Sequence, residues 1–414
     1  MRIAIVGSGI SGLVASYLLS QEHDIQLFEA NDYIGGHTHT VSVRLEERSY
    51  DIDTGFIVYN ELNYPNFTKL LDKLGVASQP SDMCLSVRSD KTGLEYGGTT
   101  PNTLFAQRRN LLRPSFYRML YGITRFNKKA QALLKDEDNR MTLGEYLEQG
   151  GYSRELIEHY VIPMGAAIWS ADPGKMREFP ARSFVQFFKN HLFLDVYNMP
   201  LWRTIKGGSH RYVEALTSSF RDRIRLSSRV QSIRRFDDGV ELHHAGGETE
   251  RFDQVVIATH SDQALSLLAD PIELEREVLG AISYQENDVV LHTDERLLPR
   301  NRRAWASWNY FIPDQPQPRA SVTYNMNMLQ SLDAPVTFCV TLNRTGDISP
   351  DKMLQRFRYH HPVFSLDALD AQKRWGEVSG QRRTHYAGAY WGYGFHEDGV
   401  KSGLAVCGRF GKTL

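Results

Sequence analysis

The chain opens with a change in its hydrophobic pattern. Residues 3–6 form an uninterrupted apolar run, which predicts a buried strand. A glycine-rich turn at residues 7–12 follows directly, and residues 13–19 continue with helical character. Residues 25–28 are typical of a second strand, which ends in Glu29. The order of strand, glycine turn, helix, strand and acidic residue predicts a βαβ unit that binds a dinucleotide.

Each glycine of the turn has a physical role. Gly7 makes the tight turn, Gly9 leaves room for a pyrophosphate, and Gly12 lets the helix pack closely against the strand. The helix N-terminus offers free N–H groups to phosphates, and Glu29 can accept hydrogen bonds from ribose hydroxyls. The predicted nucleotide contacts here are Gly7, Ser8, Gly9, Ile10, Ser11, Gly12, Glu29 and Ala30.

A Gly35-Gly36 doublet begins six residues after Glu29. With this doublet the chain resembles the flavin-containing amine oxidoreductase superfamily, which includes amine oxidases, phytoene-type desaturases, protoporphyrinogen oxidase and certain fatty acid isomerases. Its members carry a glutamate and then Gly-Gly, usually followed by arginine. This chain has His37 in place of the arginine. The exchange keeps the loop geometry but weakens the case for a cationic phosphate contact.

Later segments extend the resemblance over the whole chain. Residues 50–57 look like the family's strand and glycine turn beneath the flavin ring. Residues 229–233 and 255–259 look like its second cofactor segment, and residues 388–400 look like the segment that caps the isoalloxazine. The resemblance implies FAD as the cofactor, with further contacts from Gly35, Gly36, His37, Thr38, Thr54, Gly55, Phe56, Ile57, Val230 (at the adenine), Thr259, Gly388, Gly394, Phe395, His396, Glu397 and Gly399.

The predicted fold class is α/β, with an α+β substrate domain. We expect a Rossmann-like FAD-binding domain of the amine oxidase type, built from residues 1–80, 203–265 and 381–414. Residues 81–202, expected to be largely helical, and residues 266–380 form a discontinuous substrate domain. Helices are predicted at 67–74, 105–134, 142–149 and 184–193, and strands at 225–228, 239–242, 288–292, 321–325 and 336–342.

Composition fits a large soluble enzyme. The 414 residues are 41% hydrophobic and 23% charged, which is ordinary and leaves enough core for two domains. The net charge of −1 gives no reason to expect a nucleic-acid partner. Cys84, Cys339 and Cys407 form no CxxC pair, so no metal site is expected. We find no signal peptide and no apolar run of about 18 residues, so a cytoplasmic protein is expected.

Catalytic residues are harder to predict. His396 is the candidate general base because an unperturbed imidazole titrates near neutrality; the alternative is a positioning role without proton transfer. Tyr390 and Tyr324 are candidates for lining the pocket, and ordinary core packing is the alternative for both. The helix that begins near Gly394 is expected to direct its positive end at the flavin.

One segment, residues 105–135, is basic and apolar without a single acidic residue. Such a segment predicts peripheral contact with an anionic membrane at its inner face. The alternative is a solvated helix face whose apolar side lies in the core. Pro114 is expected to start or break a helix there. The basic residues are Arg108, Arg109, Arg113, Arg118, Arg125, Lys128, Lys129 and Lys135; the apolar ones are Leu111, Leu112, Phe116, Tyr117, Met119, Leu120, Tyr121, Ile123 and Phe126.

Three functions remain open. The first is an FAD-dependent oxidoreductase for a hydrophobic substrate, which desaturates or isomerises a fatty acyl chain by flavin-mediated hydride transfer. Residues 322–327 and 394–399 look like a bacterial subgroup of NAD/FAD-binding proteins linked with cyclopropane-fatty-acid-synthase-like proteins. The second is a flavin amine oxidase, and the third a non-redox lipid-binding protein with this fold. The chain carries a single dinucleotide fingerprint, so we expect the substrate to reduce the flavin or the reduction to be transient. The sequence leaves use of a pyridine nucleotide, the electron acceptor and the oligomeric state open.

Overall fold

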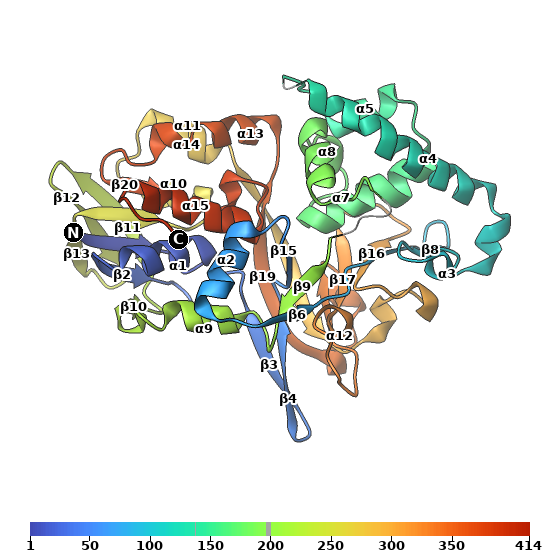
Figure 1. Ribbon diagram of the computed structural model, residues 1–414, viewed down its shortest axis with the longest axis horizontal. Coiled ribbons are helices and arrows are strands. Elements are labelled where there is room, and N and C mark those ends of the chain that lie inside the picture. Colours follow the sequence, from blue (N-terminus) through green and yellow to red (C-terminus); the bar gives the residue numbers. More distant parts are fainter. Residues whose placement is uncertain (137, 196–199) are drawn as a thin grey trace.

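The computed structural model describes residues 1–136, 138–195 and 200–414. A parallel five-stranded sheet, in the order β10-β2-β1-β14-β20, lies in the half of the molecule that holds both chain ends (Figure 1). Its strands come from three separate stretches of sequence. They are β1 (Arg2–Val6), β2 (Asp24–Phe28), β10 (Ile224–Arg225), β14 (Gln254–Ile257) and β20 (Thr384–Tyr386).

Both faces of this sheet are covered. In β1, Ile3 and Ile5 belong to one hydrophobic core, whereas Ala4 and Val6 belong to another. Successive strand residues point to opposite faces, so a strand between two cores requires an unbroken apolar run. One face packs against α1 (Ile10–Leu19), α2 (Pro65–Leu74), α9 (His210–Thr217) and α15 (His396–Gly408). The other packs against α10 (Ser261–Leu267), α11 (Glu273–Gly280) and an antiparallel sheet of β11 (Val230–Phe236), β12 (Gly239–His244) and β13 (Thr249–Phe252).

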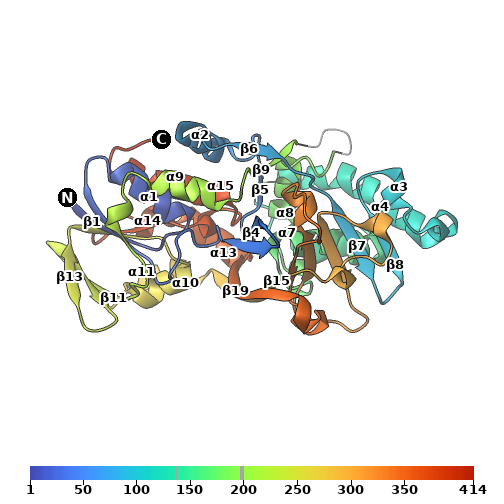
Figure 2. The ribbon, with the colours of Figure 1, turned by 90° about the horizontal axis from the view of Figure 1, so that it is seen from below.

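A mixed seven-stranded sheet, in the order β19-β15-β18-β17-β16-β7-β8, forms the other half. Its long antiparallel pair β15 and β19 lies in the middle of the molecule, between the two halves (Figure 2). The strands are β7 (Leu85–Ser89), β8 (Leu94–Gly97), β15 (Ser283–His292), β16 (Trp308–Ile312), β17 (Ser321–Asn325), β18 (Cys339–Leu342) and β19 (Met353–Val363). Two smaller sheets pair β3 (Thr40–Leu45) with β4 (Arg48–Asp53), and β9 (Trp202–Ile205) with β5 (Val58–Asn60) and β6 (Ser78–Pro80).

Helices pack against the large sheet and share one core with it. Phe126, Phe184 and Phe188 of these helices are fully buried in that core. None of the helices in the described residues is long and apolar enough to cross a membrane. The main helices here are α4 (Pro114–Ala130), α5 (Leu143–Gln149), α7 (Ile162–Trp169) and α8 (Ala181–Asn190). The remaining helices of the molecule are α3 (Pro101–Leu104), α6 (Arg154–Leu156), α12 (Met326–Leu329), α13 (Leu366–Lys373), α14 (Trp375–Val378), η1 (Arg108–Leu112), η2 (Gln131–Lys135), η3 (Ile157–Val161), η4 (Lys175–Arg177), η5 (Arg221–Arg223), η6 (Glu295–Leu297), η7 (Arg302–Ala304), η8 (Thr345–Asp347), η9 (Pro350–Lys352) and η10 (Ala389–Trp391).

The structure differs from the sequence expectations in four places. The strand expected at 336–342 begins only at Cys339. Residues 81–202 contain β7 and β8, a hairpin that joins the large sheet through β16, so this stretch is less helical than expected. The strand expected at 225–228 ends at Arg225. Val278, Leu279 and Val378 pack in the same core as Ala4, although the expected domain boundaries put them in the substrate domain. Pro114 begins α4, as predicted, directly after η1.

A buried ion pair ties the second face of the parallel sheet together. Arg235 of β11 bonds to Glu275 of α11 (Nη2–Oε2 2.9 Å), and Tyr386 of β20 donates to the same carboxylate at 2.7 Å. Arg235 also donates to Asp270 at 2.9 Å. The Arg235 side chain is 0% exposed and that of Glu275 1%, so neither charge can be stabilised by water.

Removing one partner leaves the other charged and buried, which costs about 3–5 kcal/mol. We therefore predict that Arg235→Met lowers the free energy of unfolding by about this amount, measured by urea denaturation. The exposed neighbour on the same strand provides the matched control, Arg234→Met, which should change it by less than about 0.5 kcal/mol. Equal midpoints for the two variants would contradict the assigned role.

Candidate active site

A cavity of about 930 Å³ begins at the carboxyl ends of β1, β2 and β14 and continues between the two halves of the molecule. Ligands of open parallel sheets bind at this edge. Gly7, Glu29 and Thr259 line its first end, and Val289 and Tyr324 line its far end. The cavity therefore joins the predicted nucleotide site to the large mixed sheet.

The glycine turn has the geometry of a phosphate cradle. Gly7 has φ 105° and donates its N–H to the carbonyl of Phe28 at 2.9 Å. A Cβ on Gly12 would lie 2.0 Å from the carbonyl oxygen of Gly7, so α1 can approach β1 only with glycine there. A Cβ on Gly9 would instead meet nothing within 4 Å and would project into open space. The residues present therefore fit a pyrophosphate above Gly9, at the N-terminus of α1.

Glu29 already serves as an acceptor in the protein alone. Its Oε2 accepts from the Ser8 amide at 3.0 Å and from the Ser8 hydroxyl at 2.6 Å, and its Oε1 accepts from the Asn31 amide at 2.9 Å. The Ser8 hydroxyl can rotate. A ribose hydroxyl would take its place on Glu29, as predicted for an acidic residue at the end of β2.

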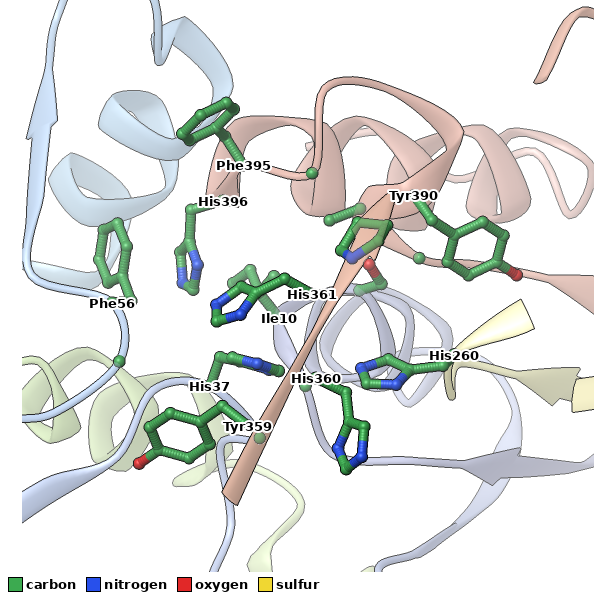
Figure 3. Close-up of a pocket in the computed structure, with 18 of the residues that line it drawn as sticks. Ile10, His37, Phe56, His260, Tyr359, His360, His361, Tyr390, Phe395 and His396 are labelled. Carbon is green, nitrogen blue, oxygen red and sulfur yellow. The ribbon is translucent and has the colours of Figure 1, made fainter. Parts of the chain in front are cut away.

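The middle of the cavity has tight backbone contacts. A Cβ on Gly55 would lie 2.1 Å from the carbonyl oxygen of His37, which accepts from the Phe56 amide at 2.8 Å. The Phe56 ring stacks on His396, with centroids 3.6 Å apart and planes 8° from parallel (Figure 3). The 37–38 loop, the 54–57 turn and the start of α15 thus form one packed unit.

His396 is held by hydrogen bonds and does not suit the role of general base. Its Nε2 lies 2.7 Å from the Tyr212 hydroxyl and 3.3 Å from that of Thr38. Burial, assisted by the nearby His37, lowers the pKa of His396 to about 3. The imidazole is therefore neutral at pH 7 and too weak a base for proton abstraction near neutrality. The structure favours the positioning role.

Four histidines from three segments surround the middle of the cavity (Figure 3). The ring of His37 lies 5.5 Å from His361 and 5.9 Å from His260, which is 6.4 Å from His360. Burial above all lowers the pKa of His37 to about 4 and that of His260 and His361 to about 3. His37 is thus neutral at pH 7 and does not replace the charge of an arginine. No metal-binding cluster of His, Cys, Asp or Glu occurs in the part of the chain that the structure describes.

The two candidate tyrosines have different environments. Tyr390 lines the cavity, as predicted, and also packs with Ile282 and Ala368. Its hydroxyl has no hydrogen-bond partner among the described residues and points away from the histidines in Figure 3. Tyr324 lines the far end, with its ring perpendicular to that of Trp308 at 5.0 Å. Burial raises the pKa of Tyr324 to about 12, so its hydroxyl stays protonated.

Most of the predicted cofactor residues line the cavity, and four do not. Gly12 acts through packing against the Gly7 turn, as described above, and the Thr38 hydroxyl bonds to Tyr212 at 2.5 Å. The Glu397 carboxylate accepts from the Phe67 amide at 2.9 Å and so caps α2. Gly399 allows α15 to pack against α1. Those that line it are Gly7, Ser8, Gly9, Ile10, Ser11, Glu29, Ala30, Gly35, Gly36, His37, Thr54, Gly55, Phe56, Ile57, Val230, Thr259, Gly388, Gly394, Phe395 and His396.

The N-terminus of α15 is partly satisfied within the protein. Asp398 accepts from the amides of Tyr393 at 3.0 Å and Phe395 at 3.1 Å. Burial raises the pKa of Asp398 to about 6. These two amides are therefore not available to a ligand. The stabilisation that the helix N-terminus was expected to give the flavin can come only from the remaining amides of the first turn.

Sequence reasoning missed the contribution of β19. The Tyr359 hydroxyl lies 2.7 Å from that of Thr54 and 2.8 Å from Nδ1 of His39, and Nδ1 of His361 accepts from the side-chain amide of Asn287 at 2.9 Å. The run Arg358-Tyr359-His360-His361 was a usable signal, because four long polar side chains in succession are unusual in a strand beside a core.

A side chain at Gly9 would meet no protein atom, so a substitution there should affect cofactor binding without affecting folding. In Gly9→Val the side chain would occupy the open space above the turn, so we predict a folded protein without flavin. Gly376→Val is the matched control, because its site is also open but lies in α14, and it should keep its flavin. The measurement is visible flavin absorbance per protein, alongside thermal melting of each variant. Full flavin content in Gly9→Val would exclude a pyrophosphate at this turn.

We further predict that the flavin is noncovalent. In families that this chain resembles, covalent linkage typically uses a cysteine near the C-terminal flavin segment. Cys407 is fully buried against α1, with Sγ 4.0 Å from the carbonyl of Ala15, and neither Cys84 nor Cys339 is among the described lining residues. Acid precipitation should release all flavin into the supernatant, and flavin that stays with the pellet would refute the prediction.

Comparison with known proteins agrees with this geometry. Two solved structures share the fold over 99% of this chain: a CLA-producing fatty acid isomerase from P. acnes (TM-score 0.70, 18% identity, 98% of that chain) and cyclohexylamine oxidase from Brevibacterium oxydans (TM-score 0.69, 15% identity, 99% of that chain). A Mycobacterium tuberculosis protein, whose name assigns it to the flavin-containing monoamine oxidases, is 23% identical over 65% of this chain. The match spans 59% of the length of the Mycobacterium tuberculosis protein. An uncharacterised Methanocaldococcus jannaschii protein is 25% identical over 36% of this chain, and that match spans 34% of its own length.

The sequence model of one family, described as flavin containing amine oxidoreductase, matches residues 10–328. That is more than half of the chain; the match begins inside the glycine turn and includes Gly12, Glu29 and the Gly35-Gly36 doublet. The chain therefore belongs to the flavin-containing amine oxidoreductases, a family of FAD-dependent oxidoreductases, and its cofactor is FAD.

Proposed function

We propose that the protein oxidises or isomerises a hydrophobic substrate, and that this substrate is a fatty acyl chain. The observation that carries the proposal is the far end of the cavity, beyond Phe56 and His396. Its walls come from α7, α8, the large sheet and adjoining loops, and apart from Ser170 and His191 they are mostly apolar or aromatic. The apolar and aromatic residues include Met83, Ile168, Trp169, Phe187, Phe193, Val289, Trp308, Tyr324, Leu342 and Phe364.

The electrostatics of the cavity support the same class of substrate. Among the described lining residues Glu29 is the one carboxylate, and it lies at the nucleotide end. The nearby histidines His37, His361 and His396 are neutral at pH 7 because burial lowers their pKa. A cationic ligand loses hydration in such a chamber without gaining a carboxylate partner, whereas an acyl chain gains from the transfer.

FAD, when bound, supplies the acceptance of a hydride, and the chain supplies position and exclusion of water. Phe187, Val289 and Leu342 shield the reacting carbons from solvent. Tyr324 keeps its proton, since burial raises its pKa to about 12. Its hydroxyl is therefore a hydrogen-bond donor that can orient a polar end of the substrate.

An amine oxidase is the second candidate, favoured by the family match and by the cyclohexylamine oxidase and monoamine oxidase relatives. The fatty acid isomerase among the solved structures favours the first candidate. A non-redox lipid-binding protein is the third. The absence of a carboxylate from the described far end weighs against recognition of a charged amine, although aromatic ring faces attract a cationic ammonium group.

The test is anaerobic reduction of the purified yellow protein by a panel of free fatty acids and phospholipids against a panel of amines. We expect bleaching, or turnover with transient bleaching, with acyl substrates. Bleaching by amines alone would assign the second function. Acyl binding without any spectral change or product would assign the third.

Two adjacent residues of β15 give a matched pair for this assay. Val289 lines the chamber, whereas Val290 faces the small core with Leu297 and Ile348 on the other side of the sheet. Val289→Thr should raise KM for the acyl substrate by about tenfold, because a hydroxyl then faces the chain. Val290→Thr should leave KM unchanged, and equal KM values for both variants would contradict this placement of the substrate.

A further inference from the structure

Large apolar side chains are exposed together at the turn from η1 to α4. Leu112 is 90% exposed, Tyr121 70%, Leu111 48% and Tyr117 46%. These four residues, called the η1–α4 tip below, make up four of the ten large apolar side chains that are exposed among the described residues. They border a shallow hollow with Pro114. Clustering of this kind marks an interaction surface, whereas single exposed apolar residues do not.

The amphipathic character of α4 does not account for the tip. The inner face of the helix places Phe116, Met119 and Phe126 in the core with 0–2% exposure. Tyr117 and Tyr121 lie one turn apart on the opposite face, where a solvated helix would carry polar residues. The solvated-face alternative thus explains the buried residues of segment 105–135 and leaves the tip unexplained.

The charge around the tip is positive and largely uncompensated. Of the eight basic residues of segment 105–135, Arg118 alone has a carboxylate partner among the described residues, Glu155 at 2.5 Å. Arg108 donates to the carbonyl of Phe105 at 2.7 Å, and Arg125 to that of Gly151 at 3.1 Å. Carbonyl acceptors fix these side chains without neutralising them, so the tip is bordered by fixed positive charge.

We propose that the η1–α4 tip docks on the surface of an anionic lipid bilayer. Leu111 and Leu112 enter the boundary between headgroups and acyl chains, the tyrosine rings lie at headgroup level, and the surrounding arginines and lysines face anionic headgroups. The tip lies at the end of the molecule opposite the N-terminus (Figure 1). Its residues do not line the main cavity, so this proposal is independent of the substrate.

Charge also selects the bilayer over a second copy of the chain. A two-fold contact brings the same patch of two molecules together. Here it would place Arg109, Lys128 and Lys129 of one copy against those of the other, and like charges repel. An anionic bilayer satisfies both the apolar and the charged groups.

Vesicle co-sedimentation of the holoenzyme at low salt tests the proposal, with phosphatidylglycerol/phosphatidylcholine vesicles and pure phosphatidylcholine vesicles as probes. Wild type should bind the anionic vesicles, bind the neutral ones weakly, and lose binding in 1 M salt, where the Debye length falls from about 10 Å at 0.1 M to about 3 Å. Wild-type protein that fails to sediment with anionic vesicles would overturn the proposal.

Two variants separate the apolar and the charge contributions. Leu111→Ser/Leu112→Ser and Lys128→Glu/Lys129→Glu should each weaken binding to anionic vesicles by about tenfold or more. The matched controls, Leu62→Ser/Leu354→Ser and Arg221→Glu/Arg234→Glu, remove two leucines and reverse two positive charges in exposed residues elsewhere, and they should bind as wild type does.

Flavin content and melting temperature should stay at wild-type values in all four variants, because each replaced side chain is exposed. Equal binding by the tip variants and their controls would overturn the proposal. So would light scattering that shows a dimer lost in Leu111→Ser/Leu112→Ser, since that result assigns the tip to self-association.

Discussion

The contact between α1 and the turn after β1 is the constraint on which the cofactor end of the molecule depends. It exists because Gly12 has no side chain to meet the carbonyl of Gly7. The same kind of contact continues outward, since a Cβ on Gly403 would lie 2.8 Å from the carbonyl oxygen of Ser11. The Ser11 hydroxyl also donates to the carbonyl oxygen of Gly399 at 2.9 Å. Glycine contacts therefore stack β1, α1 and α15, and bring the two ends of the chain to one cavity.

A buried carboxylate holds the next part of the cavity in register. Asp53 accepts from the amide of Ser209 at 2.8 Å and from the hydroxyl of Thr40 at 2.5 Å, and Gln330 donates to it at 3.2 Å. Burial raises the pKa of Asp53 to about 7, despite these donors. This one side chain joins the 40–53 hairpin, the start of α9 and the end of α12. It thereby fixes the position of the 54–57 turn, which carries Phe56.

Charge is distributed unevenly over the molecule. The far end of the cavity is mostly apolar, and burial keeps histidines in its middle, such as His361 and His396, neutral. The tip of α4, at the other end, carries apolar side chains beside positive charge. The chain therefore has a strongly basic surface although its net charge is −1, because acidic residues elsewhere balance these positive charges. Local charge and exposure, rather than the total, decide what each surface can bind.

The sequence by itself determined the parallel sheet, the glycine turn with Glu29 and the start of α4 at Pro114, and most of the cofactor residues that it predicted line the cavity. These depend on local patterns: apolar runs, glycine spacing and the fixed φ of proline. Only the tertiary structure decided that Glu397 caps α2 and that the Tyr390 hydroxyl points away from the histidines of the cavity. It also decided that His396 is too weak a base for catalysis and that β19 contributes Tyr359 and His361 to the cavity wall. Burial and partners from distant segments set those roles, and no local pattern encodes either. The same reason applies to Leu112 and Phe116. Both are apolar residues of one segment, but Leu112 is exposed to solvent and Phe116 is buried in the core.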